Sequence, residues 1–243
     1  MITRLDIEYE GGAFAGWARQ PGQRTVQGEL ETALATLLRA DVDLTVAGRT
    51  DRGVHAWAQV ASYAGPPPDL RAVNALTPPD VAVLRAVEAP PGFSARHDAL
   101  SRTYCYRVLA RRAPSPFEVG RALHWRHAVD RDALRRCARL LEGTHDFTAF
   151  TPTETYHVRF DRDVLDARWE ERGEILELWI TADAFMRGMV RVLAGTMLEV
   201  GGGRRSVDDF AALLEGAPRD RAGPTAPAHG LYFAGAAYDD GAR

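Results

Sequence analysis

The sequence predicts an α/β fold of the mixed (α+β) type, in which strands and helices are intermixed along the chain. Two kinds of apolar periodicity predict it. In residues 3–10, Leu5, Ile7 and Tyr9 alternate with charged residues, which is the pattern of a half-buried strand. In residues 26–38, apolar residues recur every three or four positions and form one face of a helix. A chain of 243 residues with 46% hydrophobic residues can bury a core.

The remaining elements of the N-terminal part are bounded by capping and turn residues. Thr25 is placed to cap the first helix, which is expected to end near Arg39. No glycine-rich phosphate-binding motif follows a predicted strand. In order, the further elements are strands at 44–46 and 57–63, a helix at 70–76 capped by Asp69, and a strand at 81–86.

The C-terminal part is predicted to begin with a strand at 101–109, and the two halves of the chain are placed at 1–101 and 102–243. A proline-containing loop at 111–120 follows that strand. The further elements are a helix at 133–141 capped by Asp130, strands at 164–169 and 174–181 joined by a hairpin at 171–173, a helix at 184–200 capped by Asp183, a helix at 207–215 capped by Ser206, and a last strand ending at Tyr238.

The charge is close to balanced, with a net charge of −3, and all 30 basic residues other than histidine are arginines. Arginine suits bidentate contacts with phosphate and stacking on bases, so its exclusive use is compatible with RNA binding. A GC-rich genome explains the same composition. The balance argues against a uniformly basic nucleic-acid binder, and any basic surface must be local.

No metal site, disulfide or membrane segment is expected. His124 and His127 are three residues apart but have no evident further ligand, and Cys105 and Cys137 form no CxxC pair. The chain has no run of about 18 apolar residues, and its N-terminus lacks the pattern of a signal peptide. We therefore expect a cytoplasmic protein.

A polar turn between the strands predicted at 44–46 and 57–63 presents Asp51. Gly48 and Gly53 bracket the turn, and Arg49 and Arg52 flank the aspartate and favour its ionised form. An ionised carboxylate that is held in place can act as nucleophile or base. Read from the residues alone, an ordinary solvated turn explains the same pattern.

Two further pairs of side chains also allow two interpretations. Tyr104 and Tyr106 share one face of a predicted strand, as core tyrosines commonly do. Arg187 and Arg191 are four residues apart in the helix predicted at 184–200, and such a stripe can bind a ligand or face solvent.

Several stretches resemble the motifs of the tRNA pseudouridine synthase A family, and together they span nearly the whole chain. The turn reads Gly-Arg-Thr-Asp-Arg-Gly-Val-His-Ala, and Asp51 occupies the position of the family's catalytic aspartate. Arg52 departs from the pattern, because a small residue usually follows that aspartate. The other matching stretches are a looser match at 9–20, the Arg-x-Tyr-x-Tyr run at 102–106, the segment from Ala184 to Gly195, and the Ala-Pro-x-x-Gly-Leu-Tyr run at 226–232.

The resemblance implies the pseudouridine synthase fold, with two similar halves of mostly antiparallel sheet flanked by helices around a central basic cleft, and it implies a homodimer. It implies an isomerase that converts uridine to pseudouridine at positions 38, 39 and 40 of the tRNA anticodon stem-loop, with no metal or organic cofactor. Asp51 would be the nucleophile, Arg191 would pair with it, and Tyr104 would face the target base. Because the target nucleotide must leave the stack, Arg49 would serve as wedge or backbone anchor.

The sequence leaves the chemical step and two rival functions open. Asp51 could attack C1′ or C6 of the nucleotide, or remove the 2′ proton. A catalytically inactive RNA-binding protein would not need to combine Asp51 with Arg191. A hydrolase of another class would need a second acid or a metal near Asp51, and none is evident.

Overall fold

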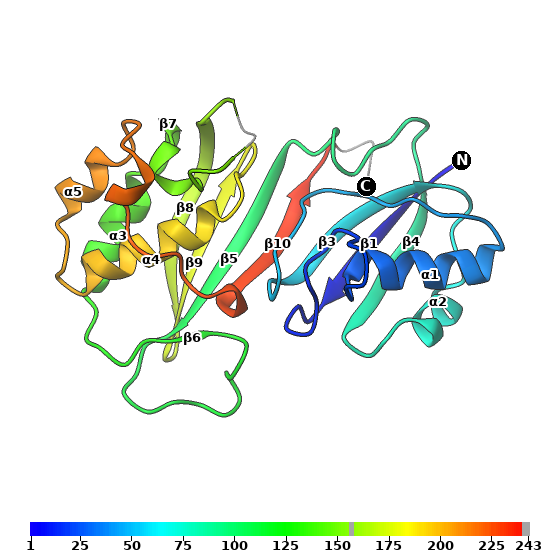
Figure 1. Cartoon of the computed structure of the whole chain (residues 1–243), viewed down its shortest axis with the longest axis horizontal. Coiled ribbons are helices and arrows are strands. Elements are labelled where there is room, and N and C mark those ends of the chain that lie inside the picture. Colours follow the sequence, from blue (N-terminus) through cyan, green and yellow to red (C-terminus); the bar gives the residue numbers. More distant parts are fainter. Residues whose placement is uncertain (156–157, 240–243) are drawn as a thin grey trace. The chain divides into compact units, whose positions relative to one another are not determined.

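A computed structural model describes residues 1–155 and 158–239. The chain forms two compact units. The first unit comprises residues 1–102 and 232–239, and the second unit comprises residues 103–231. Each unit has its own strands and helices (Figure 1). Within the described ranges, every helix is too short or too polar to span a bilayer.

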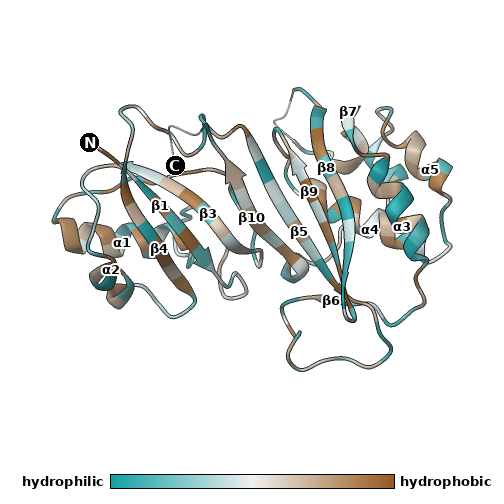
Figure 2. Cartoon of the chain, turned by 180° about the vertical axis from the view of Figure 1, so that it is seen from behind, coloured by the Kyte–Doolittle hydropathy of each residue, from teal (hydrophilic) through white to brown (hydrophobic). Residues whose placement is uncertain are grey.

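The sheet of the first unit has the strand order β4-β1-β3-β10. β1 (Ile2–Tyr9) pairs antiparallel with β3 (His55–Ala64) and with β4 (Val81–Ala89), whereas β10 (Leu231–Ala237) runs parallel to β3. The short β2 (Thr45–Val46) pairs antiparallel with β3. Every second side chain of β1 is buried, and the same alternation is visible as hydropathy in Figure 2. The predicted period-two strand is therefore confirmed.

Helices α1 (Val26–Leu38) and α2 (Leu70–Leu76) cover one face of this sheet (Figures 1 and 2). Thr25 caps α1 and Asp69 caps α2, each by accepting the backbone N–H of the third residue beyond it. α1 ends where Arg39 adopts the left-handed conformation at φ 54°. Both predicted caps and the predicted end of α1 are confirmed.

The sheet of the second unit has the strand order β5-β9-β8-β7. β8 (Asp161–Arg172) pairs antiparallel with β9 (Ile175–Ala182) and with β7 (Gly143–Asp146). The predicted hairpin between β8 and β9 is present, but its turn lies at 173–174, because residues 171 and 172 are still paired with β9. The short β6 (Leu123–His124) runs parallel to β5 (Ser101–Leu109).

The helices of the second unit are α3 (Arg131–Arg139), α4 (Met189–Gly201) and α5 (Val207–Ala212). α3 packs against α4 and β8, and α5 packs against both α3 and α4. Asp130 caps α3 and Ser206 caps α5, as predicted, and Ser206 forms a capping box with Asp209. Short 3-10 helices lie at η1 (Thr148–Phe150), η2 (Arg219–Arg221) and η3 (Ala228–Gly230).

The predicted start of α4 was wrong, and the error changes the environment of one arginine. Gly188 adopts φ 70° and precedes the first helical residue, so the helix does not extend back to 184. Asp183 instead accepts the N–H groups of Asp163 and Ala184. Arg187 therefore lies before the helix, and the predicted stripe of Arg187 and Arg191 on one helix does not exist.

The predicted end of α5 was also wrong. The helix was expected to reach residue 215 but ends at Ala212, because Glu215 forms a bridge with Asp146 at the end of β7. The predicted fold class, a mixed α/β fold with mostly antiparallel sheet flanked by helices, is confirmed. The division into halves at 101/102 and the central basic cleft stay predictions.

Candidate active site

Asp51 lies in the first unit, in a tight turn between β2 and β3. Its carbonyl oxygen accepts the N–H of Val54 at 3.2 Å, and Gly53 occupies the third position of that turn at φ 77°, a conformation that favours glycine. Asp51 also forms an antiparallel bridge with Gly16. The carboxylate is partly exposed, whereas the neighbouring Thr50 is buried. The turn thus holds the backbone of Asp51 while presenting its side chain.

The backbone leading to Asp51 is held by donors from three separate parts of the first unit. The carbonyl of Ala47 accepts from Nε of Arg102 at 3.1 Å, and that of Gly48 accepts from Nε2 of Gln59 at 2.9 Å. The carbonyl of Thr50 accepts from the backbone N–H of Trp17 at 3.0 Å. Because the loop is already fixed at these points, it loses little further conformational entropy when a ligand binds.

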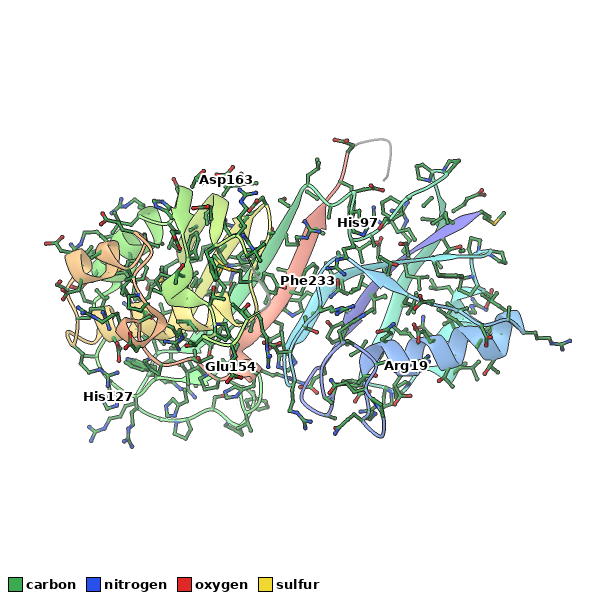
Figure 3. The ribbon with its side chains drawn as sticks, turned by 45° about the horizontal axis from the view of Figure 1, so that its top comes forward. Arg19, His97, His127, Glu154, Asp163 and Phe233 are labelled. Carbon is green, nitrogen blue, oxygen red and sulfur yellow. The ribbon has the colours of Figure 1, made fainter. Side chains whose placement is uncertain are left out.

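A second layer of contacts supports the segment before β2. Glu31 of α1 is buried and accepts the backbone N–H of Leu44 at 3.0 Å and Nε2 of Gln27 at 2.8 Å. Arg19, labelled in Figure 3, forms an ion pair with the same carboxylate. The buried charge of Glu31 is therefore compensated, as buried charges must be.

The segment at 11–17 approaches the Asp51 turn so closely that only glycine fits at Gly11. A Cβ atom at Gly11 would lie 1.9 Å from the carbonyl oxygen of Val54. The N–H of Gly11 donates to Nδ1 of the buried His55 at 2.9 Å, so the proton of a neutral His55 is on Nε2. Glu10 Oε1 lies 3.3 Å from the same Nδ1, but an Nδ1 that accepts a hydrogen bond carries no proton for an ion pair.

Gly11→Ala is expected to destabilise the fold by about 3 kcal/mol or more, because the new methyl group collides with backbone that cannot rotate away. Gly12→Ala is the matched control. Its Cβ would meet only the flexible carboxylate of Glu10, so a change within about 0.5 kcal/mol is expected. Urea unfolding of both variants measures the difference. Equal stabilities would show that the 11–17 segment can shift away from the turn.

Arg191 lies in the second unit, in the first turn of α4, and is held to the chain near Ala226. Its Nε donates to the carbonyl of Ala226 at 2.7 Å, and its own carbonyl accepts the N–H of Ala226 at 3.0 Å. A Cβ at Gly195, one helical turn further, would lie 1.9 Å from the carbonyl of Pro224. The close packing of α4 against residues 224–226 therefore fixes the plane of the Arg191 guanidinium.

Tyr106 and His229 share the surroundings of Arg191. Tyr106 is fully buried, and its hydroxyl donates to the carbonyl of Pro227 at 2.8 Å. Burial raises the pKa of Tyr106, which keeps it protonated, and the positive charge of Arg191 only partly opposes this. Burial, with the charge of Arg191, lowers the pKa of His229 and favours its neutral form. Tyr106 is thus a core tyrosine.

Tyr104 lies on β5 and is 8% exposed. Its ring packs edge-on against Phe185, with 4.9 Å between ring centroids. Phe185 lies in the segment between β9 and α4, and Thr103, beside Tyr104, makes a 2.9 Å hydroxyl contact with Thr181 of β9. These contacts fix the orientation of the phenol ring.

The predicted site residues divide between the units. Asp51 and Arg49 belong to the first unit, where Arg49 is exposed, and Tyr104 and Arg191 belong to the second. The pairing of Asp51 with Arg191 stays a prediction. Arg52, which departs from the family pattern, is exposed and donates to the side chain of Gln23 at 3.2 Å.

The described residues offer neither a metal site nor a reactive thiol. Across residues 1–155 and 158–239, no group of three or more His, Cys, Asp or Glu side chains is arranged to hold a metal ion. Cys105 and Cys137 are buried, and burial raises the pKa of both thiols, to about 11 for Cys137. Neither thiol has the low pKa of a catalytic cysteine.

Comparison with known proteins identifies the family. The family described as tRNA pseudouridine synthase matches residues 137–239. The tRNA pseudouridine synthase A of Thermus thermophilus is 45% identical over 246 residues, which cover 97% of this chain and 96% of that protein. The protein of the same name from Bacillus velezensis is 40% identical, covering 99% of this chain and 100% of that protein. This chain belongs to the tRNA pseudouridine synthase A family.

These relatives confirm the family that the sequence motifs indicated, and the chain is an isomerase. Among solved structures, a chain described under "Crystal Structure of a Cbf5-Nop10-Gar1 Complex" has a TM-score of 0.33 and 12% identity, covering 81% of this chain and 54% of that one. So low a similarity supports no inference.

Sequence reasoning missed the residues that hold the signature turn of this tRNA pseudouridine synthase A family member. The sequence places Gln59, Arg102 and Tyr9 only within strands or motifs. A glutamine within the apolar run at 57–63 was the available signal for Gln59, because a buried amide needs a polar partner. For Arg102 no local pattern pointed to the carbonyl of Ala47.

Proposed function

We propose that this protein isomerises uridine to pseudouridine at positions 38, 39 and 40 of the tRNA anticodon stem-loop. The observation that carries the proposal is an identity of 40 to 45% with two proteins named tRNA pseudouridine synthase A over nearly the full length of both partners. The rigidly held turn that presents Asp51 supports it. We also propose that the enzyme works as a homodimer in the cytoplasm.

Four residues would carry the reaction, two from each proposed half (1–101 and 102–243). Asp51 supplies the carboxylate that acts on the nucleotide, and Arg191 orients that carboxylate through two parallel hydrogen bonds and keeps it ionised once water is expelled. Arg49, exposed on the turn, takes the place of the displaced base or anchors the backbone. Tyr104, held by Phe185, offers its ring to the target uracil.

The reaction is an internal transfer that needs no cofactor. The bond between N1 of uracil and C1′ of the ribose breaks, the uracil turns, and C5 forms the new bond to C1′. The hydrogen on C5 then leaves to solvent, and N1 takes up a proton, so atoms and charge balance. Extruding the nucleotide costs a few kcal/mol, which arginine contacts with the tRNA phosphates would offset.

The proposal is tested with unmodified tRNA tritiated at C5 of uracil. A pseudouridine synthase releases tritium to water, an RNA-binding protein without activity releases none, and a glycosidic hydrolase yields free uracil. A matched tRNA with cytidine at positions 38, 39 and 40 should release no tritium. Release from that control would place the reaction elsewhere in the tRNA.

A further inference from the structure

Buried, hydrogen-bonded side chains connect the core of the first unit to Thr50, the residue that precedes Asp51. The hydroxyl of Tyr9 on β1 lies 2.7 Å from Oγ1 of Thr50, and Nε2 of Gln59 on β3 lies 3.3 Å from the Tyr9 hydroxyl. The same Nε2 donates to the carbonyl of Gly48 at 2.9 Å. Tyr9, Thr50 and Gln59 are 5%, 7% and 0% exposed, so water does not replace these bonds.

Gln59 is the donor in both of its hydrogen bonds, because its Nε2 lies beside the Gly48 carbonyl and the Tyr9 oxygen. The Tyr9 and Thr50 hydroxyls share a hydrogen bond in which either oxygen can be the donor. Burial raises the pKa of Tyr9 to about 12, which keeps its phenol protonated at neutral pH.

These hydrogen-bonded side chains hold the two residues that flank Arg49. Gln59 holds the backbone of Gly48, and Tyr9 holds the side chain of Thr50, whose carbonyl is also held by Trp17. Removing the hydroxyl of Tyr9 would leave buried polar groups of Thr50 and Gln59 without their partner. The turn would then move toward other partners, and Asp51 would move with it.

We propose that Tyr9 and Gln59 are positioning residues, which set the placement of the Asp51 carboxylate through Thr50 and Gly48. The inference rests on the proposed function of Asp51. It predicts a defect in the chemical step, because a carboxylate misplaced by a fraction of an ångström reacts slowly even when substrate binds normally.

Tyr9→Phe tests the inference, because it removes one oxygen and keeps the ring. We expect kcat for tRNA to fall by about 10- to 100-fold, with KM changed by less than about three-fold. Tyr63→Phe is the matched control. Tyr63 is a buried tyrosine of β3 whose hydroxyl donates to the carbonyl of Pro66 at 2.6 Å, away from the turn. The Tyr63→Phe variant should lose about as much thermal stability as Tyr9→Phe but keep its kcat within about two-fold of the unmodified protein.

Thr50→Val removes the other partner of the same hydrogen bond. It provides a second test if Tyr9→Phe does not fold. It should lower kcat to a similar extent, and the double variant should be no slower than the slower single variant, because both changes break one bond. Fully additive losses, or a kcat loss in Tyr63→Phe equal to that in Tyr9→Phe, would overturn the inference. An inactive unmodified protein would instead overturn the proposed function, and the inference would fall with it.

Discussion

Asp51→Asn is expected to leave no detectable tritium release from tRNA while tRNA affinity stays within a few-fold of the unmodified protein. The amide has nearly the shape of the carboxylate but neither its charge nor its nucleophilicity. The contacts that hold the turn use the backbone of Asp51 and the groups of Ala47, Gly48 and Thr50, so the fold should survive. Tritium release and fluorescence anisotropy with labelled tRNA measure the two effects.

Asp43→Asn is the control for the loss of one negative charge near the turn. Asp43 is exposed and lies just before β2, so activity and affinity should both stay within about two-fold. If Asp51→Asn instead weakened binding strongly and kept its residual turnover, Asp51 would belong to recognition and not to the chemical step.

Arg191→Lys is expected to lower kcat by about 100-fold while the protein remains folded. The guanidinium donates through Nε to the carbonyl of Ala226. A planar guanidinium has five N–H donors in a fixed fork, so it can hold that carbonyl and also orient a carboxylate with two parallel bonds. One ammonium group cannot serve the Ala226 carbonyl and a carboxylate with the same geometry. The kcat for tritium release and the melting temperature are the quantities to measure.

Arg139→Lys at the end of α3 provides the comparison, because it makes the same chemical change on an exposed helical face. Its kcat should not change. Near-normal activity of Arg191→Lys would mean that Arg191 does not orient Asp51. A melting temperature lowered by more than about 10 °C would assign Arg191 to the packing of α4 against residues 224–226.

Local chemistry made the helix boundaries predictable wherever a side chain caps the helix. Thr25, Asp69, Asp130 and Ser206 each lie where a short polar side chain precedes an amphipathic run, and each accepts the expected N–H. Asp183 has the same local appearance, but its carboxylate bonds to β8. That competing partner is remote in sequence, so the early start predicted for α4 could not be corrected from local pattern.

The candidate site shows the same limit. Asp51, Tyr104 and Arg191 were chosen because their motifs match a family, and each match depends on contiguous residues. The partners that hold the Asp51 turn come from β1, β3 and the start of β5, and only the register of the sheet brings them there. Strand pairing is non-local, so Gln59 and Arg102 could not be paired with their carbonyls from sequence.

The parallel pairing of β10 with β3 has a consequence for how the protein is made. Tyr232 of β10 stacks on His55, the residue directly after the Asp51 turn, with 4.7 Å between ring centroids. The whole second unit is synthesised after His55 and before Tyr232. A chain emerging from the ribosome therefore cannot complete the sheet beside the Asp51 turn until the whole second unit has been synthesised. Until then the edge of β3 at residues 55–56 lacks its native partner, which exposes it to mispairing and makes folding depend on a late, long-range closure.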